Sequence, residues 1–127
     1  MTEKSNLSNR AQSFRYAFQG LRTLVQQEAN ARIHLAATLI VITAAAILEI
    51  DSNGWRWLWV AIAAVWVTEA LNTAIERIAD AAVPKPHPLI REAKDVAAAA
   101  VLISAFAAVL IGLSVLGPAL LRFLARI

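Results

Sequence analysis

Three long apolar segments constrain this chain more than any other feature of its sequence. They cover residues 33–50, 55–83 and 92–116, and a helix needs about 17–25 apolar residues to cross the hydrocarbon core of a bilayer. Hydrophobic residues make up 59% of the 127 residues, more than a soluble domain of this length can bury. We therefore predict an all-α membrane protein with three transmembrane helices in a single membrane domain, residues 1–127.

Residues 8–30 precede the first apolar segment and are predicted to form an amphipathic helix. Phe14, Phe18 and Leu21 recur at helical spacing, and Arg15 and Arg22 lie between them. This segment carries too many charges to cross a bilayer, so we place it on the membrane surface, in the plane of the interface. The alternative is an ordinary helix that packs on a soluble partner.

Turn-forming residues separate the predicted transmembrane helices. The polar residues 51–54 predict a tight turn before the second helix. Residues 84–88, which contain three prolines, end that helix, because proline removes an amide donor and restricts the residue before it. Gly117 and Pro118 predict a break after the third helix, before a short basic tail.

The distribution of lysine and arginine predicts the orientation in the membrane. The N-terminal segment and the loop between the second and third helices hold most of these residues, and the opposite side holds few. The first group is Lys4, Arg10, Arg15, Arg22 and Arg32, the second is Arg77, Lys85, Arg91 and Lys94, and the third is Arg56, Arg122 and Arg126. The positive-inside rule places the N-terminus and the loop in the cytoplasm, and the chain in the cell (inner) membrane. Basic residues near helix ends fit anionic lipid headgroups, so no nucleic-acid partner is expected.

An acidic stripe on the second helix is the strongest sign of chemistry. Glu69, Glu76 and Asp80 fall within a narrow arc at about 100° per residue, with Asn72 at its edge. An acid at the centre of a spanning helix costs about 2.5–3.5 kcal/mol on insertion scales, so three acids on one face require a reason. They either form a functional site at the cytoplasmic end, where ATP is present, or pair with Arg77, Lys85 or Lys94 and only fix helix packing.

Two further features suggest how phosphate chemistry would be assembled. Glu28 is the nearest separate carboxylate, and two carboxylates from different helices suit Mg²⁺, although a charged residue on an interfacial helix is often only solvated. Lys94 and Asp95 begin the third helix, where a lysine either binds phosphate or only snorkels to the interface. There is no cysteine and no glycine-rich phosphate loop, so any nucleotide site must be built on the spanning helices.

These residues resemble the signature of the bacterial diacylglycerol kinase and undecaprenol kinase family. The matching positions are residues 69–76, Asp80, His87 and residues 93–102, with residues 14–21 and 28–32 upstream. The similarity covers about residues 10–115. It implies a homotrimeric bundle whose active sites are shared between subunits. It also implies transfer of the ATP γ-phosphate to the primary hydroxyl of a membrane lipid, diacylglycerol or undecaprenol.

The resemblance also implies roles for individual residues. Glu69 would be the general base, Glu28 and Glu76 would hold the Mg²⁺ on the nucleotide, and Asn72 and Asp80 would orient the site. The nucleotide would be contacted by Arg10, Tyr16, Glu28, Glu76, Lys85, His87, Lys94 and Asp95, and the lipid by Glu69, Arg22, Arg32 and Ala98. This chain lacks the aromatic residue that some members carry at position 86, which puts the adenine contacts there in doubt.

The choice of lipid and two other classes of function stay open at this point. Residues 32–35 and 87–89 look more like the undecaprenol kinase branch, which is a slight preference only. An intramembrane glutamate also suits a small proton- or cation-coupled transporter, but here the acids cluster at one end of the helix. A non-enzymatic assembly protein that uses the small residues 97–100 for close packing would leave the acidic stripe unexplained.

Overall fold

The computed structural model describes residues 2–127 as four helices joined by short connections, with side chains described from Arg10 onward. The helices are α1 (Thr2–Gln27), α2 (Ala29–Ile47), α3 (Ser52–Ala82) and α4 (Pro88–Leu124). Within this part of the chain, α2, α3 and α4 are long and apolar enough to cross a membrane. The prediction of an all-helical chain with three membrane-crossing helices is confirmed. Lys4, which entered the count of basic residues, lies outside the residues whose side chains are described.

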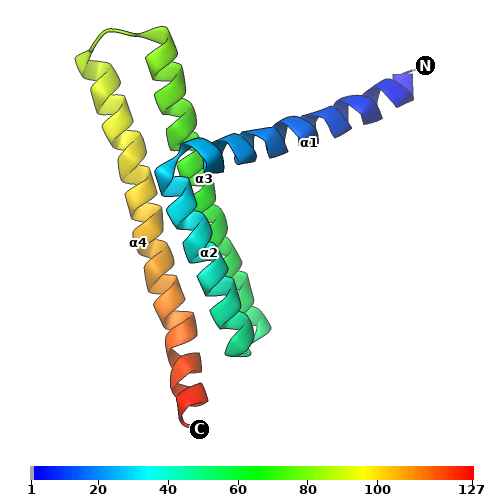
Figure 1. Cartoon of the computed structure of the whole chain (residues 1–127), viewed down its shortest axis with the longest axis vertical. Helices are drawn as coiled ribbons and strands as arrows, with labels where there is room; N and C mark the ends of the chain where they lie inside the picture. The colour runs from blue at the N-terminus through cyan, green and yellow to red at the C-terminus, as the bar shows by residue number, and fades with distance from the viewer. Residues whose placement is uncertain (1) are drawn as a thin grey trace.

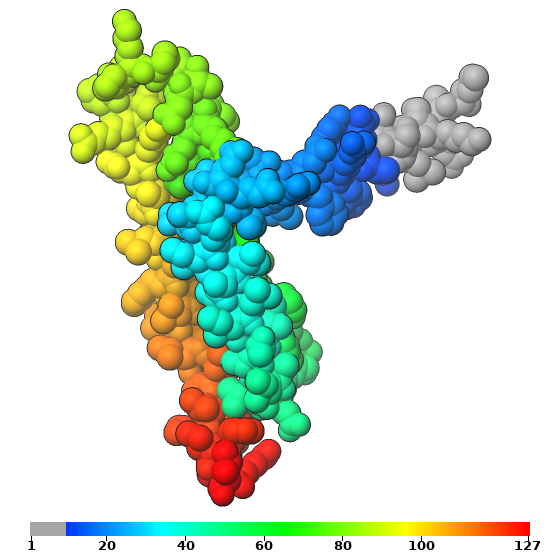
Figure 2. Space-filling view, in the orientation of Figure 1, coloured from blue at the N-terminus to red at the C-terminus, as the bar shows by residue number. Residues whose placement is uncertain are grey.

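The three long helices form a narrow bundle, and α1 leaves it at a steep angle (Figures 1 and 2). α3 and α4 pair as an antiparallel hairpin that makes the most extensive contact in the chain, and α2 runs beside α3. α3 and α4 extend past the junction of α1 and α2 toward the connection at residues 83–87 (Figure 1). The polar residues on α3 therefore lie beside the point where the chain turns from α1 into α2.

Small residues fill the contacts between helices. Nine hydrophobic residues are buried among the side chains described from Arg10 onward, and Leu58 is the largest of them that is fully buried. Six of the nine are alanines: Ala31, Ala45, Ala61, Ala79, Ala97 and Ala119. Small side chains let helix backbones approach closely, which is the usual basis of packing between membrane helices. Large apolar side chains such as Ile103 and Phe106 are exposed. The bundle therefore presents its apolar surface to lipid instead of enclosing it.

The turn between α2 and α3 comes earlier than the sequence predicted. It covers residues 48–51, and Glu49 adopts a left-handed conformation with φ of 49°. Asp51 caps α3, because its side chain accepts a 2.7 Å hydrogen bond from the Gly54 backbone amide. Residues 52–54 thus belong to the first turn of α3, and the predicted turn at 51–54 is wrong in position because Asp51 is a helix cap.

The sequence predicted that prolines end both α3 and α4, and only the prediction for α3 is correct. α3 ends at Ala82, just before the proline-containing connection, as predicted. His87 then caps α4 by accepting a 3.3 Å hydrogen bond from the Leu89 backbone amide, and Pro88 occupies the first helical position. The predicted break at Gly117 and Pro118 is wrong, since α4 continues through Pro118 to Leu124. Spanning helices tolerate an internal proline because local adjustments satisfy the backbone groups that it frees.

Candidate active site

Two polar contacts set the register between α2 and α3. The Trp66 indole donates a 3.1 Å hydrogen bond from Nε1 to Thr38 Oγ1. One turn along, Nε2 of His34 lies 3.7 Å from Oε2 of Glu69. The two helices run antiparallel. One turn back along α2, from Thr38 to His34, therefore corresponds to one turn forward along α3, from Trp66 to Glu69. This register brings His34 opposite the acid that the sequence predicts to be the base.

A third polar contact ties the α1–α2 junction to α3. Nη2 of Arg77 donates to Oε1 of Gln27 at 2.9 Å and to Oε1 of Glu28 at 3.1 Å. Glu28 follows Gln27, the last residue of α1, and is the N-cap residue of α2, with an extended backbone conformation. The change of direction at this residue turns its carboxylate toward α3. Glu28 thus contacts α3 through Arg77, and its predicted part in a metal site with the acidic stripe stays a prediction.

A polar cavity of about 340 Å³ lies between these elements. Its polar lining comes from the start of α2 and from the acidic stripe of α3, and α4 contributes small and apolar residues. The lining residues are Asn30, Ile33, His34, Glu69, Asn72, Glu76, Ala98, Val101, Leu102 and Ala105. Among the predicted site residues, Glu69, Asn72, Glu76 and Ala98 therefore face one cavity.

Glu69 is the most deeply buried acid among the described side chains, at 2% exposure. Its Oε2 is buried and has no hydrogen-bond partner within the described part of the chain, and neither has Oδ1 of Asn72. The amide nitrogen of Asn72, Nδ2, donates a 3.2 Å hydrogen bond to Oε1 of Glu76. Buried polar atoms are almost always hydrogen-bonded, so two unpaired oxygens on one cavity point to a place where something else binds.

Glu69 and Glu76 line this cavity and Glu28 lies outside its lining, and carboxylate oxygens of this kind suit a hard cation. Glu28 and Glu76 both lie near enough to Glu69 for their charges to act on it, and both are only partly buried. Among the described residues no group of three histidine or acidic side chains is close enough to hold an ion alone. One or two carboxylates, with water and phosphate oxygens, are the ligands that Mg²⁺ usually takes. The donor set fits an ion that arrives with a nucleotide.

The α3–α4 interface carries two more polar contacts. Lys94 donates to Oδ1 of Asp80 near the 83–87 connection, and deeper in the bundle the hydroxyls of Thr68 and Ser104 lie 2.6 Å apart. The Asp80 pair is one of the alternatives that the sequence left open, an acid of the stripe held by a lysine. Glu69, by contrast, has no lysine or arginine partner among the described residues.

Several predicted site residues do not reach the cavity within one chain. They are exposed and absent from its lining, and they lie on α1, on the start of α2, in the 83–87 connection and on the start of α4. They are Arg10, Tyr16, Arg22, Arg32, Lys85, His87 and Asp95. Arg32 donates to the Gln26 carbonyl oxygen at 3.2 Å, and the Tyr16 hydroxyl accepts from Gln12 at 2.9 Å. Their predicted roles are not tested by the geometry of a single chain.

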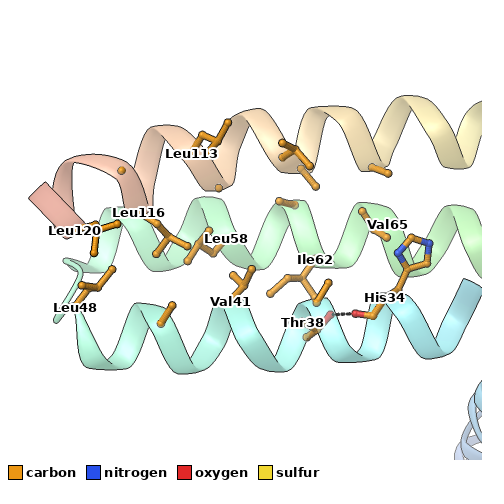
Figure 3. A pocket seen from close by; sticks show the side chains of 18 residues that line it. His34, Thr38, Val41, Leu48, Leu58, Ile62, Val65, Leu113, Leu116 and Leu120 are labelled. Carbon is orange, nitrogen blue, oxygen red and sulfur yellow. Dashed lines mark hydrogen bonds between the residues drawn. The ribbon is translucent and has the colours of Figure 1, made fainter.

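A second cavity, almost entirely apolar, runs along the bundle between α2, α3 and α4 (Figure 3). Its volume is about 550 Å³. His34 lies at one end of the row of lining side chains, and Leu48 and Leu120 lie at the other (Figure 3). His34 and Ala105 also line the polar cavity. The two cavities therefore meet at His34.

The sequence left two interpretations of His34 open, a contact with a lipid headgroup or a packed interfacial residue. The available signal was its spacing from Thr38, since two polar residues four apart on a mostly apolar helix share a face. That pattern indicates which face of α2 meets polar groups, but it does not say which residue of α3 lies opposite. The register contact between Thr38 and Trp66 supplies that missing information.

The fold and the site together define a multi-pass helical membrane protein with a buried carboxylate on a polar cavity. Residues 15–116 match the family model described as prokaryotic diacylglycerol kinase. The chain belongs to this family, and it is an enzyme of the diacylglycerol kinase and undecaprenol kinase type. The family predicted from the sequence is confirmed, and the transporter alternative has no support.

Some relatives of this chain are named diacylglycerol kinase and another is named undecaprenol kinase. The chain is 40% identical over 113 residues to the diacylglycerol kinase of Synechocystis sp., a match that covers 88% of this chain and 65% of that protein. It is 33% identical over 117 residues to the undecaprenol kinase of Bacillus subtilis, covering 92% of this chain and 95% of the relative. The diacylglycerol kinase of Escherichia coli K12 is 35% identical over 95 residues, with 75% and 78% covered. The lipid named therefore differs among relatives of similar identity.

Proposed function

We propose that the chain transfers the γ-phosphate of ATP to the primary hydroxyl of a membrane lipid alcohol. The observation that carries this proposal is the buried Glu69 carboxylate, which has an unpaired oxygen on a polar cavity beside two other acids. Phosphoryl transfer needs positioning, charge neutralisation and a proton acceptor more than covalent chemistry from the protein. The cavity offers a candidate for each requirement.

Glu69 accepts the proton of the lipid hydroxyl in the proposed reaction. The hydroxyl oxygen forms a bond to the γ-phosphorus, the bond from that phosphorus to the β,γ-bridging oxygen breaks, and ADP leaves. The products are the lipid phosphate and ADP, and Glu69 later releases the proton to water. Its burial supports this role, because a carboxylate shielded from water meets the hydroxyl without competition from bulk solvent.

Glu28 and Glu76 hold a Mg²⁺ ion that enters with the nucleotide. When bound, the ion would supply positive charge against the charge that develops on the phosphate oxygens. The hydrogen bond from Asn72 to Glu76 keeps one oxygen of that carboxylate oriented along α3. Lys94 and Asp95, with Arg10, Tyr16, Lys85 and His87, contact the nucleotide. Arg22, Arg32 and Ala98 lie next to the lipid, and Asp80 orients Lys94.

The active protein is a homotrimer in the cell (inner) membrane, with its N-terminus in the cytoplasm. Arg10 and Tyr16 belong to α1, which projects from the bundle (Figure 1), so in this proposal they serve the cavity of a neighbouring subunit. Exposed Phe14, Phe18 and Leu21 on α1 support a helix that lies on the membrane surface. The excess of basic residues on the N-terminal segment and around the α3–α4 connection, where Arg77, Lys85, Arg91 and Lys94 lie, supports the orientation.

Of the two lipid alcohols, we favour undecaprenol. Residues 32–35 and 87–89 support this choice, and the relative named undecaprenol kinase matches nearly its whole length. The relatives named diacylglycerol kinase make diacylglycerol the acceptor to compare. The two lipids share a primary hydroxyl next to an apolar body, so Glu69 has the same role with either.

The test uses the full chain, purified in detergent, with labelled ATP and each lipid in turn. Wild-type protein should label undecaprenol faster than diacylglycerol, and removal of Mg²⁺ by a chelator should stop both reactions. Glu69→Gln, which keeps the shape of the side chain, should lower kcat by about 10²–10⁴-fold and leave the oligomeric state unchanged. Full activity of Glu69→Gln would refute its assignment as the base. Failure of the wild type to label either lipid would refute the proposed function.

A further inference from the structure

His34 is the unassigned side chain closest to the proposed chemistry. Its Nε2 lies 3.7 Å from Oε2 of Glu69, an oxygen that has no hydrogen-bond partner among the described residues. The imidazole is mostly shielded, with 17% of its side chain exposed. Within the described chain, no other positively charged or potentially positive side chain lies within ion-pair distance of Glu69.

We propose that His34 is a positioning residue that fixes the Glu69 carboxylate for the incoming lipid hydroxyl. The inference rests on the proposed function, because it assigns His34 a role through Glu69. By holding the carboxylate toward α2, His34 fixes the direction from which Glu69 receives the proton of the hydroxyl. The distance of 3.7 Å is longer than a hydrogen bond, and such contacts in ligand-free sites often shorten only when the substrate is bound.

The local packing holds His34 in place. Its backbone carbonyl accepts a 2.7 Å hydrogen bond from the Thr38 hydroxyl, which in turn accepts the Trp66 indole N–H. The Trp66 contact fixes the register of α2 against α3 one turn away from Glu69. The imidazole thus approaches Oε2 from a helix whose position relative to α3 is already set, which is what a positioning residue requires.

The location of His34 also fits a substrate with an apolar body and a polar end. His34 lines both the apolar cavity and the polar cavity (Figure 3). The hydroxyl of a lipid alcohol must come to the boundary between apolar and polar surroundings to meet Glu69. At this boundary His34 orients the base without competing for the nucleotide or its metal ion.

The experiment compares kcat with the KM for lipid and the KM for ATP in four proteins. His34→Phe keeps a planar ring and removes the donor, and His34→Gln keeps a donor. Trp66→Phe is the matched control, because it removes the neighbouring hydrogen bond between the same helices and Trp66 lines neither cavity. His34→Phe should lower kcat by about 10- to 100-fold with both KM values unchanged. His34→Gln should recover most of that loss, and Trp66→Phe, which removes a register contact but keeps the imidazole donor, should lower kcat much less than His34→Phe does.

Each outcome bears on the inference. Equal kcat for His34→Phe and wild type would overturn it, and so would an equal loss in His34→Phe and Trp66→Phe, because His34 would then only pack α2 on α3. Failure of His34→Gln to recover activity would overturn the role of the donor. If His34→Phe does not assemble, His34→Leu takes its place. No turnover by the wild type would refute the proposed function as well, so the two failures are distinguishable.

Discussion

Arg77 on α3 donates a hydrogen bond of 3.1 Å to Oε1 of Glu28 at the α1–α2 junction. The side chains are 45% and 32% exposed, so the pair is only partly shielded from water. The contact holds Glu28 against the helix that carries Glu69 and Glu76. It also means that a cation bound by Glu28 competes with the guanidinium for the same carboxylate.

Replacing Arg77 should therefore strengthen magnesium binding. Partly exposed ion pairs are worth about 0.2–1 kcal/mol, so Arg77→Gln should lower the Mg²⁺ concentration for half-maximal activity by about 1.4- to 5-fold. A magnesium titration of phosphoryl transfer measures this. Arg91→Gln removes an exposed positive charge from α4 and should leave the titration unchanged. An increased magnesium requirement in Arg77→Gln would mean that Arg77 orients Glu28 instead of competing for it.

Substitutions of Lys94 and Asp80 distinguish a lysine that only forms an ion pair from a lysine that also contacts the nucleotide. The Asp80 side chain is 70% exposed, so the ion pair alone contributes little. If Lys94 also binds phosphate, Lys94→Met should raise the KM for ATP by about 10-fold or more, the usual cost of losing a hydrogen bond to a charged group. Asp80→Asn should change that KM much less. Equal effects of the two substitutions in initial-rate assays would show that Lys94 acts only through Asp80.

The number of helices and the position of the acids were predictable because both depend on local sequence. Apolar length gives the spanning helices, and helical spacing places Glu69 and Glu76 on one face. The end of α3 followed from proline chemistry. Pro118 misled the prediction because a spanning helix satisfies its freed backbone groups in ways that a sequence does not display.

The contacts between helices were beyond the sequence for a different reason. His34 meets Glu69, and Arg77 meets Glu28, only because α2 and the end of α1 run beside α3 in one particular register. That register depends on the Trp66–Thr38 hydrogen bond and on close packing of alanines. No spacing within a single helix encodes it. The sequence accordingly predicted the acids and left Lys94 open as a partner of Asp80, but it did not predict that His34 meets Glu69 or that Arg77 meets Glu28.

The paired hydroxyls of Thr68 and Ser104 should contribute a measurable share of the α3–α4 packing. Hydrogen bonds between membrane helices are worth about 0.6 kcal/mol on average, with a maximum near 1.7 kcal/mol. Ser104→Ala should lower the free energy of unfolding by an amount in this range, as measured by titration with sodium dodecyl sulfate. Ser114→Ala, whose hydroxyl contacts the Ile111 carbonyl of its own helix, is the control and should have a smaller effect. If the two variants lose the same free energy of unfolding, the hydrogen bond between the helices contributes no more than a hydroxyl contact within one helix.

Gly54 should be the glycine at which the fold tolerates an added methyl group least. A Cβ placed there would lie 3.0 Å from Cγ1 of Val115, 3.2 Å from Oδ1 of Asp51 and 3.3 Å from Cδ1 of Ile50. Since the Asp51 carboxylate caps α3 through the Gly54 amide, the methyl group would disturb both the cap and the approach of α4. Overpacking of this kind costs about 1–3 kcal/mol.

Gly54→Ala should therefore lower the thermal denaturation midpoint in detergent and leave the KM for ATP unchanged, because Gly54 lies in the first turn of α3 and does not line the polar cavity. Gly20→Ala is the matched control. Its Cβ would meet no atom within 4 Å, and alanine is favoured over glycine within a helix by about 0.5–1 kcal/mol. The control should thus be neutral or slightly stabilising. A Gly54→Ala protein as stable as wild type would show that α4 moves away from α3 at this end at little cost.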